Sequence, residues 1–318
     1  MEKERNHISV LVPTYNETEN VEALCEALVQ EFSTSLPDYD YDILFIDNAS
    51  SDGTREKLFG LCAVNPRVRA IFNARNFGQF NSPYYGICQT TGDCTISMCA
   101  DFQDPVEMLP KLVEKWEQGY LVVCAVKTAS RENKLLRWLR SCYYKLIKKT
   151  SRVPQIEHFT GFGLYDKSFV KIMQELDDPT PFLRGIVAEF APRRTEIPYT
   201  QARRRAGHTH NNLGSLYDAA WQSFTIYTKF PIRFVAVLGW LLLSVSVAVG
   251  AALLVGVWAG HLWAPWLWLF PALFFCTALM LISLSVLGEY IITLRDKVMR
   301  RPLVVEERRI GFEPPSPN

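Results

Sequence analysis

A long stretch without charged residues constrains this chain more than any other feature. Among its 318 residues, those from Phe234 to Gly288 include no Asp, Glu, Lys or Arg. A helix needs roughly 20 apolar residues to cross a bilayer. The stretch therefore has room for two membrane-spanning helices, which we place near 234–258 and 265–288. The alternative is a buried helical hairpin in a soluble protein, but core helices rarely lack charges on every face.

Basic residues flank this stretch on both sides. They are Lys229, Arg233, Arg295, Lys297, Arg300 and Arg301. The connection between the two predicted spans contains only His261 as a titratable residue. Segments rich in Lys and Arg stay on the cytoplasmic side of a membrane, and the opening MEKERNHISV does not have the form of a signal peptide. We therefore expect an integral protein of the plasma or inner membrane with both termini and the N-terminal part in the cytoplasm. The 8 cysteines form no C-x-x-C pair, which fits free thiols in that compartment.

The residues before this stretch alternate between short apolar strands and helical patterns. Strands are predicted at 7–15, 41–47, 67–73, 94–100 and 121–126. Asn16 with Glu19 forms a predicted capping box for the first helix. Apolar strands separated by helices predict an α/β fold with a mostly parallel sheet that is covered on both faces. Ligands bind such sheets at the carboxyl ends of the strands.

Polar side chains gather at these predicted strand ends. The segments PTYNE, DNAS, ARNFG and ADFQD each follow an apolar strand, so we expect them to meet at one edge of the sheet. The chain contains neither G-x-G-x-x-G nor G-x-x-x-x-G-K-[ST], the loops that hold phosphates in dinucleotide-binding and P-loop proteins. The edge offers carboxylates instead, from Glu17, Asp47, Asp101 and Asp104.

Carboxylates repel a diphosphate unless a divalent cation lies between them. Mg²⁺ binds one or two carboxylates together with phosphate oxygens and water. Asp101 is the predicted ligand because it ends a strand, and Gln103 adds a neutral oxygen. The alternative is that Asp101 only caps the next helix. Asp104 fits that capping role better, because Pro105 follows it at the first helical position.

The order of the motifs resembles a known family. VPTYNETEN, FIDNASSDGT, ARNFGQ, TTGD, CADFQDP and KWEQGY together look like family 2 glycosyltransferases with the GT-A fold, which is Rossmann-like. Within that family, the chain is most similar to the polyprenyl-phosphate glycosyltransferases, which include dolichol-phosphate mannose synthases and bacterial GtrB-like glucosyltransferases. The likeness covers about residues 7 to 305.

The resemblance implies roles for individual residues. The nucleotide sugar would contact Pro13, Tyr15, Glu17, Asp47 and Arg75, with Asp47 at the base. Asp101, as a catalytic residue, and Gln103 would hold Mg²⁺ or Mn²⁺ on the diphosphate. RRRAGHTH resembles a segment that meets the acceptor phosphate, which assigns Arg204, Thr209 and His210 to that phosphate.

The chain departs from the family pattern at several positions. Cys99 stands where the family often has the first Asp of Asp-x-Asp, and Asn48 replaces a common second aspartate. Gly161 and Gly163 replace an Asp and an Arg of a segment that often reads G-D-F-R-L. If a catalytic carboxylate is needed there, Glu157 is the remaining candidate.

Basic residues later in the catalytic part are candidates for the acceptor phosphate, because arginine binds phosphate through two parallel hydrogen bonds. Besides Arg204, we assign Lys127, Arg137 and Arg184 to this site. The remaining cations of this region are expected to face solvent or anionic lipid headgroups.

These features divide the chain into four parts. Residues 1–210 form a cytosolic GT-A domain, 211–232 an amphipathic interface helix or linker, 233–294 a transmembrane hairpin and 295–318 a cytosolic tail. The apolar stripe of the second part fits a helix lying in the membrane interface. It fits equally a helix packed on the catalytic domain.

The predicted activity is inverting transfer of a hexose, glucose from UDP-glucose as the first choice, to undecaprenyl phosphate at the cytoplasmic face of the membrane. A lipid phosphate is already anionic, so it needs placement in line with the anomeric carbon more than a strong base. The partners are then a nucleotide sugar, a polyprenyl phosphate and the membrane. No nucleic acid is expected, and a homo-oligomer is compatible with the sequence.

Two alternatives remain open at this point. One is transfer of mannose or another sugar to the same lipid. The other is a non-catalytic membrane scaffold with a degenerate site, which Cys99 and Gly161 favour and the retained acids oppose. A processive polysaccharide synthase is disfavoured, because two spans make a poor polymer channel and the chain has no Q-x-x-R-W motif.

The charge distribution makes a testable prediction about topology. Single cysteines introduced near either terminus of a cysteine-free variant should react with a membrane-impermeant maleimide only after the cells are opened, and a cysteine beside His261 should react in intact cells. Labelling of the C-terminus in intact cells would contradict the predicted orientation.

Overall fold

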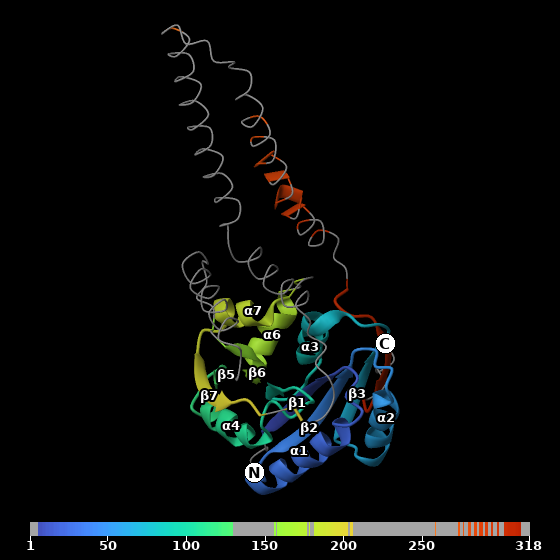
Figure 1. Ribbon diagram of the computed structural model, residues 1–318. Coiled ribbons are helices and arrows are strands. Elements are labelled where there is room, and N and C mark those ends of the chain that lie inside the picture. Colours follow the sequence, from blue (N-terminus) through green and yellow to red (C-terminus); the bar gives the residue numbers. More distant parts are fainter. Residues whose placement is uncertain are drawn as a thin grey trace, which may run out of the picture.

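An eight-stranded sheet forms the centre of the described part of the protein (Figure 1). The computed structural model describes residues 6–129, 156, 158–176, 178, 181–202, 204–205 and 302–312, together with short pieces between 258 and 298. The strands are β1 (His7–Thr14), β2 (Asp40–Asp47), β3 (Val68–Asn73), β4 (Cys94–Ser97), β5 (Val122–Ala129), β6 (Phe159–Asp166), β7 (Arg194–Thr200) and β8 (Glu306–Ile310). Their order across the sheet is β7-β5-β6-β4-β1-β2-β3-β8.

The centre of the sheet is parallel, as the sequence predicts. β1 pairs in parallel with β2 and with β4, and β2 pairs in parallel with β3. These strands are almost wholly buried, because helices cover both faces and leave no side for polar residues. The five strands predicted from the sequence are present as β1 to β5, although β4 ends at Ser97 rather than at Ala100.

Helices cover the two faces of the sheet as separate layers (Figure 1). Their bounds are α1 (Val21–Ser35), α2 (Thr54–Val64), α3 (Gly78–Cys88), the 3₁₀ turn η1 (Val106–Met108), α4 (Leu109–Glu117), α6 (Lys167–Glu175) and α7 (Leu183–Phe190). Buried residues of α1, α2 and α4 form one hydrophobic cluster with one face of the sheet. Those of α3, α6 and α7 form a second cluster on the other face. The fold is thus a three-layer α/β arrangement of the GT-A type.

Three strands extend the sheet beyond the elements predicted from the sequence. β6 runs antiparallel between β4 and β5, and β7 pairs in parallel with β5 at one edge. β8 pairs antiparallel with β3 at the other edge. Because β8 follows the predicted hairpin in the chain, the catalytic sheet includes part of the predicted tail at 295–318 as well as residues of the predicted domain at 1–210.

The predicted capping box at the start of the first helix is wrong. The N-cap of α1 is Asn20, without a hydrogen bond from its side chain to the helix. Asn16 adopts a left-handed backbone with φ of 55°, and its side-chain oxygen accepts a hydrogen bond from the Ser51 N–H. The Asn16 side chain therefore binds the loop after β2 and does not cap the helix in the way that its spacing from Glu19 predicts.

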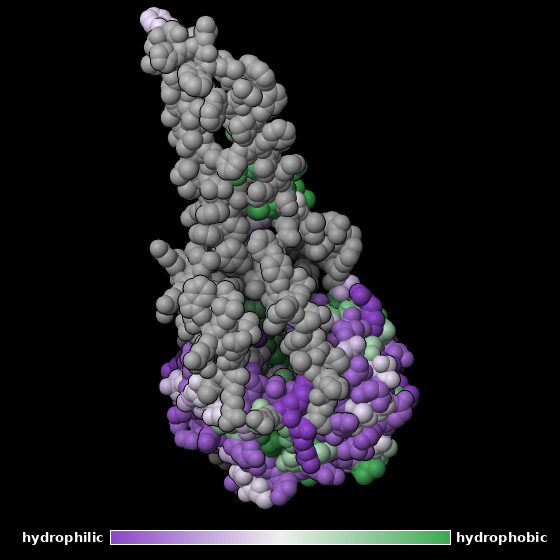
Figure 2. All heavy atoms as spheres, viewed as in Figure 1, coloured by the Kyte–Doolittle hydropathy of each residue, from purple (hydrophilic) through white to green (hydrophobic). Residues whose placement is uncertain are grey.

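The predicted membrane segments lie largely beyond the described residues. The interface helix at 211–232 is outside them entirely, and only scattered residues of the hairpin at 233–294 are described. Within the described part of the chain, no helix combines the length and apolar character that crossing a bilayer requires. The visible surface of the described catalytic part is mostly hydrophilic, with small hydrophobic patches (Figure 2), as expected for a surface in contact with water.

A buried ionic cluster joins the amino ends of the central strands. The Asp42 carboxylate accepts hydrogen bonds from His7 Nε2 at 2.6 Å, Ser9 Oγ at 2.7 Å and Arg69 Nε at 3.1 Å. Burial acts to raise the pKa of Asp42, but these hydrogen bonds outweigh it and the pKa is lowered. The hydrogen bond to Asp42 raises the pKa of His7. The cluster therefore stabilises the fold through charged forms of both groups.

This cluster predicts a pH-dependent effect of His7→Gln. A raised histidine pKa means that the charged pair stabilises the fold fully below the unfolded value of about 6.5, and that this stability is lost as pH rises through the folded pKa. At pH 6 the variant should lose about 0.5–1 kcal/mol of unfolding free energy, since His7 is partly exposed, and at pH 9 much less. Thermal unfolding of the full chain in detergent at both pH values measures this.

Arg69→Gln is the matched control, because a guanidinium stays charged at both pH values. Its destabilisation should be nearly constant between pH 6 and pH 9. A gap between wild type and His7→Gln that grows toward pH 9 would contradict the role given to the pair.

Candidate active site

The polar strand ends predicted from the sequence meet at one edge of the sheet. Thr14 lies opposite Asp47 at the ends of β1 and β2, and Asp47 lies opposite Phe72 of β3. Leu11 lies opposite Ser97, the last residue of β4. The loops after these parallel strands carry PTYNE, DNAS, ARNFG and ADFQD, so the predicted convergence is confirmed.

Asp47 is a fully buried carboxylate at this edge. Its Oδ2 accepts hydrogen bonds from Arg55 Nε at 2.8 Å and from the Ser50 N–H at 3.1 Å. Its Oδ1 is buried and accepts no hydrogen bond from the described part of the chain. A buried acceptor without a donor is costly. Asp47 therefore has one buried oxygen that can still accept a hydrogen bond.

Glu17 is held in the loop after β1. Its N–H donates to Thr54 Oγ1 at 2.9 Å, and its Oε2 accepts from Asn20 Nδ2 at 2.6 Å. The side chain is mostly buried, and its Oε1 lies 3.7 Å from Nη2 of Arg204. Glu17 therefore faces the same cation as Asp101.

Asp101 lies in a tight turn after β4. Phe102 has a left-handed backbone with φ of 60°, which turns the chain so that the Gln103 N–H donates to Asp101 Oδ1 at 3.1 Å. Asp101 Oδ2 accepts from Arg204 Nε at 2.9 Å, and Arg204 Nη2 lies 2.9 Å from the same oxygen. The guanidinium thus lies beside both Asp101 and Glu17, and its positive charge offsets the charges of the two carboxylates.

The chain after β7 folds over this turn. β7 is parallel to β5, so it ends at the same edge of the sheet as the loop after β4. The Ala202 N–H donates to the Gln103 carbonyl, and the Arg205 N–H donates to the Asp101 carbonyl, both at 3.3 Å. Gln201 Nε2 donates to Gln103 Oε1 at 2.9 Å. Gln201, Ala202 and Arg205 therefore bind the predicted metal loop, and Arg204 lies beside Asp101.

Asp104 points away from this group, and the predicted capping role is wrong. Pro105 is the N-cap of η1, with no side-chain cap. Asp104 Oδ2 accepts from the Cys99 N–H at 3.0 Å and Oδ1 from Tyr199 Oη at 2.9 Å. Burial raises the pKa of Asp104, although both hydrogen bonds oppose the shift. Asp104 therefore braces the turn by accepting one hydrogen bond on each of its oxygens.

The acidic groups fit a metal ion whose coordination shell is completed by a bound phosphate and water. Within the described ranges, no three His, Cys, Asp or Glu side chains form a set that could hold a metal by themselves. Asp101 and the amide oxygen of Gln103 supply two oxygens, with Glu17 nearby. Mg²⁺ and Mn²⁺ accept such a partial protein set when phosphate oxygens and water provide the remaining ligands.

Two of the cations assigned to the acceptor phosphate interact with each other electrostatically. Lys127 is near the end of β5, and Arg184 is in the first turn of α7. Burial lowers the pKa of Lys127, while the charge of Asp104 raises it and that of Arg184 lowers it further. Lys127 is therefore within electrostatic reach of both the acidic turn and Arg184.

The other predicted site residues are only partly placed. Pro13 ends up within β1, and Tyr15 follows it, half-buried. Arg75 is exposed, with its guanidinium 4.4 Å from the centre of the Phe77 ring. Glu157, Arg137, Thr209 and His210 lie outside the described residues.

The structure also gives roles to residues that depart from the family pattern. Asn48 Oδ1 accepts from Asn73 Nδ2 at 3.1 Å and from the Phe77 N–H at 2.9 Å, so it ties together the loops after β2 and β3. At Gly163, a Cβ atom would lie 2.3 Å from the Val123 carbonyl oxygen. A side chain such as the family's arginine therefore does not fit there without a backbone shift.

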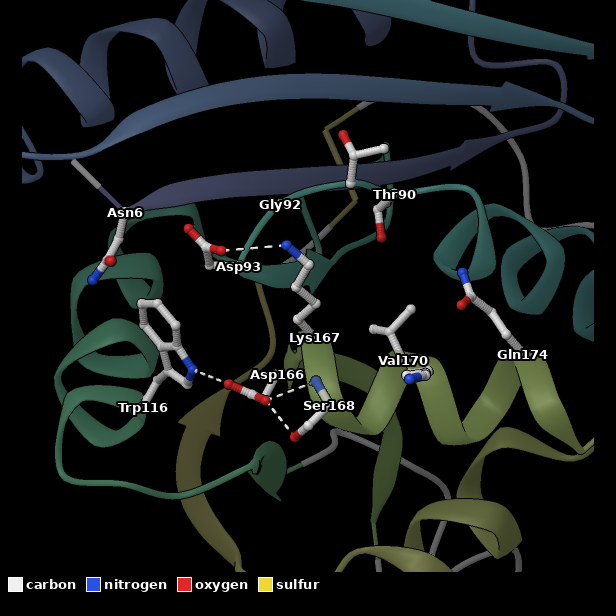
Figure 3. A pocket seen from close by; sticks show the side chains of 12 residues that line it. Asn6, Thr90, Gly92, Asp93, Trp116, Asp166, Lys167, Ser168, Val170 and Gln174 are labelled. Carbon is white, nitrogen blue, oxygen red and sulfur yellow. Dashed lines mark hydrogen bonds and ion pairs between the residues drawn. The ribbon is translucent and has the colours of Figure 1, made fainter. Parts of the chain in front are cut away.

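A hollow lies at the opposite edge of the sheet from these residues (Figure 3). Its volume is about 820 Å³, and its lining includes residues before β1 and β4. Its polar side chains pair with one another: Trp116 Nε1 donates to Asp166 at 2.7 Å, and Lys167 Nζ lies 3.5 Å from Asp93. Asp166 also caps α6 through the Ser168 N–H. These contacts account for the fold, and the hollow contains none of the predicted site residues.

Arg55 was not among the residues singled out in the sequence. It lies in α2, and Nη1 reaches Glu307 of β8 at 2.9 Å while Nε binds Asp47. No sequence signal indicates this contact, because the two residues are far apart in the chain and Glu307 belongs to a short charged segment.

Comparison with known proteins agrees with this geometry. Residues 9–174 match the family model described as glycosyl transferase family 2. A prophage bactoprenol glucosyl transferase homolog of Escherichia coli K12 is 30% identical over 304 residues, covering 95% of this chain and 98% of its own. A prophage-derived bactoprenol glucosyl transferase of Shigella flexneri is 31% identical over 298 residues, covering 93% and 96%.

Similar solved structures are more distant. The mannosyl-3-phosphoglycerate synthase of Rubrobacter xylanophilus has a TM-score of 0.48 and 17% identity, with 69% of this chain and 71% of that chain covered. A mannosyltransferase of Pyrobaculum calidifontis, in complex with GDP-Man and Mn²⁺, has a TM-score of 0.45 and 16% identity, with 92% and 88% covered. The family match spans more than half of the chain, and the relatives align over almost their full length. This chain therefore belongs to glycosyl transferase family 2 and is a glycosyltransferase.

Proposed function

We propose that the protein transfers glucose from UDP-glucose to a polyprenyl phosphate, with inversion at the anomeric carbon. The observation that carries this proposal is the group of buried carboxylates at the strand ends. Asp47 has a free oxygen for a base, and Asp101 with Glu17 shares one cation position. The names of the Escherichia coli and Shigella flexneri relatives support glucose as the sugar and a polyprenyl lipid as the acceptor.

The donor binds, in this proposal, along the loops after β1, β2 and β3. Asp47 Oδ1 accepts the ring N–H of the uracil, which satisfies an otherwise unpaired buried oxygen. Pro13, Tyr15, Glu17 and Arg75 line the rest of the nucleotide. Burial makes the base contact selective, because a base without that N–H would leave the carboxylate unsatisfied.

The diphosphate lies next to Asp101 and Gln103, which would hold Mg²⁺ or Mn²⁺. A metal ion held there would supply positive charge to the leaving nucleoside diphosphate. Arg204 supplies positive charge beside Asp101. Its planar donors are also well suited to phosphate oxygens, so the guanidinium would stabilise a diphosphate that lies next to Asp101.

The acceptor phosphate lies, in this proposal, between the acidic turn and the basic residues Lys127, Arg184 and Arg204. These cations hold the lipid phosphate in line with the anomeric carbon, and attack from that side inverts it. Thr209, His210 and Arg137 are assigned to the same phosphate. Because the phosphate oxygen is already anionic, no described side chain has to remove a proton.

The membrane part of the proposal rests on the uncharged stretch from Phe234 to Gly288. The hairpin at 233–294 places the catalytic domain at the cytoplasmic face of the plasma or inner membrane. The acceptor's polyprenyl chain stays in the bilayer, and only its phosphate reaches the protein edge described above.

An assay with labelled nucleotide sugars tests the proposed reaction. Membranes that contain the protein are incubated with labelled UDP-glucose, UDP-galactose, UDP-N-acetylglucosamine or GDP-mannose and with undecaprenyl phosphate, and the lipids are then extracted. Label should enter the lipid from UDP-glucose and should depend on added undecaprenyl phosphate. Lipid labelled only from GDP-mannose would replace glucose by mannose, and no labelled lipid from any donor would refute the proposal.

Two substitutions in the acidic turn separate metal binding from structure. Asp101→Asn removes the charge that holds the metal, which is worth several kcal/mol in the transition state, so kcat should fall at least about 100-fold. Asp104→Asn keeps an oxygen that can accept from Tyr199. It should mainly reduce the unfolding free energy, by about 1–3 kcal/mol, and so lower the melting temperature. Transfer rates at saturating Mn²⁺ and melting curves for both variants measure this difference. Undiminished transfer by Asp101→Asn, or by wild type in excess chelator, would contradict the metal role.

A further inference from the structure

β8, the last described strand, lies beside the loops proposed to bind the nucleotide, although it comes from the far end of the sequence. β8 runs antiparallel to β3, so its first residue, Glu306, lies opposite Asn73 at the carboxyl end of β3. The Ala74 N–H donates to the Val305 carbonyl at 2.9 Å and continues this pairing into the loop. A segment that follows the predicted hairpin thereby borders the loops assigned to the donor.

The pairing is irregular at this point. Phe72 lies opposite Arg308, whereas the next residue, Asn73, lies opposite Glu306. Glu307 is therefore an extra residue in β8, which is the arrangement of a β-bulge. Bulges re-aim a side chain and are frequent beside active sites. Here the bulge directs Glu307 toward Arg55.

Arg55 is fixed at three points. Nε donates to Asp47 Oδ2 at 2.8 Å, Nη1 to Glu307 Oε2 at 2.9 Å and Nη2 to the Asn73 carbonyl at 2.7 Å. Each nitrogen of the guanidinium has its own partner, so the planar group has little freedom to rotate. Its position is set jointly by β2, β3 and β8.

The orientation of Asp47 depends on this arginine. The carboxylate is fully buried, so an ion pair with Arg55 offsets the cost of removing its charge from water. Arg55 and the Ser50 N–H both bind Oδ2, which leaves Oδ1 as the oxygen without a partner in the described chain. Rotation of Arg55 would change which Asp47 oxygen is left without a hydrogen-bond donor.

We propose that Glu307, acting through Arg55, is a positioning residue for the donor nucleotide. Glu307 holds the guanidinium in the orientation that presents Asp47 Oδ1 to the base. The donor site is complete only when the C-terminal strand is in place on β3. This inference rests on the proposed function in one respect, since it takes Asp47 to be the residue that contacts the base.

The adjacent residue Glu306 provides a matched control. It lies in the same strand, but its carboxylate accepts from Tyr85 Oη at 2.9 Å and pairs with Arg309. No contact joins Glu306 to Arg55 or Asp47 among the described residues. Substitution of either glutamate by Gln removes one charge from β8, and only Glu307→Gln removes it from the path to Asp47.

The test is calorimetric titration of UDP, with Mn²⁺ present, into the purified full-length protein in detergent. Glu307 is largely exposed, so Glu307→Gln should weaken UDP binding by only about two- to fivefold. Glu306→Gln should leave the UDP affinity unchanged. Arg55→Gln should weaken it about tenfold or more, and adding Glu307→Gln to Arg55→Gln should cause no further loss.

Kinetics with a varied donor and a varied acceptor separate positioning from general destabilisation. In Glu307→Gln the KM for the donor should rise, while kcat and the KM for the lipid phosphate stay at wild-type values. Melting temperatures of Glu307→Gln and Glu306→Gln should agree closely.

Each outcome decides between this inference and the proposed function. If wild type binds UDP and Glu307→Gln binds it equally well, or if the two substitutions are additive, the positioning role is overturned and the proposed donor stands. If wild type binds GDP and not UDP, the same series is run with GDP, and the donor assignment alone is lost. Failure of wild type to bind either nucleotide would overturn both.

Discussion

The pairing of buried carboxylates with arginines supports the rest of this structure. Asp42, Asp47 and Asp101 are all nearly or fully buried, and each has one arginine partner: Arg69, Arg55 and Arg204, respectively. A buried carboxylate without a counter-charge costs several kcal/mol, so each of these acids depends on its arginine for a stable buried position. Asp42 lies at the amino ends of the strands and serves the fold. The other two lie at the carboxyl ends, where the ligand is proposed to bind.

The three arginines differ in how far they are from their acids in the chain. Arg55 lies in α2, the helix that directly follows β2 and Asp47 in the chain. Arg69 lies on the neighbouring strand β3. Arg204 comes from the segment after β7 and lies on the turn after β4, and Glu307 comes from β8 and holds Arg55. The edge proposed to bind the donor is therefore assembled from segments near both ends of the described chain. Contacts of this kind depend on sheet order, because it decides which loops are neighbours.

The departures from the family pattern follow from packing as much as from chemistry. Asn48 uses its amide to link two loops, and a carboxylate could not donate the hydrogen bond that Asn48 Nδ2 gives to Asn76 Oδ1 at 2.9 Å. Gly163 lies where β5 approaches too closely for a side chain. Asp104, which the sequence pattern assigns to capping the next helix, instead accepts hydrogen bonds from Tyr199 and the Cys99 N–H. The acidic turn thus presents one aspartate and one amide oxygen to a ligand.

By itself, the sequence determined the parallel centre of the sheet and the acids at the strand ends, because apolar runs and local periodicity report burial directly. It did not predict β6, with its two glycines, or β7 and β8, which are edge strands rich in charged residues and lack an apolar pattern. Only the tertiary structure decided that Arg204 pairs with Asp101, that Asp104 binds Tyr199 and the Cys99 N–H, and that Glu307 binds Arg55. The physical reason is that a charged side chain selects its partner by position in space, and strand order and a single bulge set that position across the length of the chain.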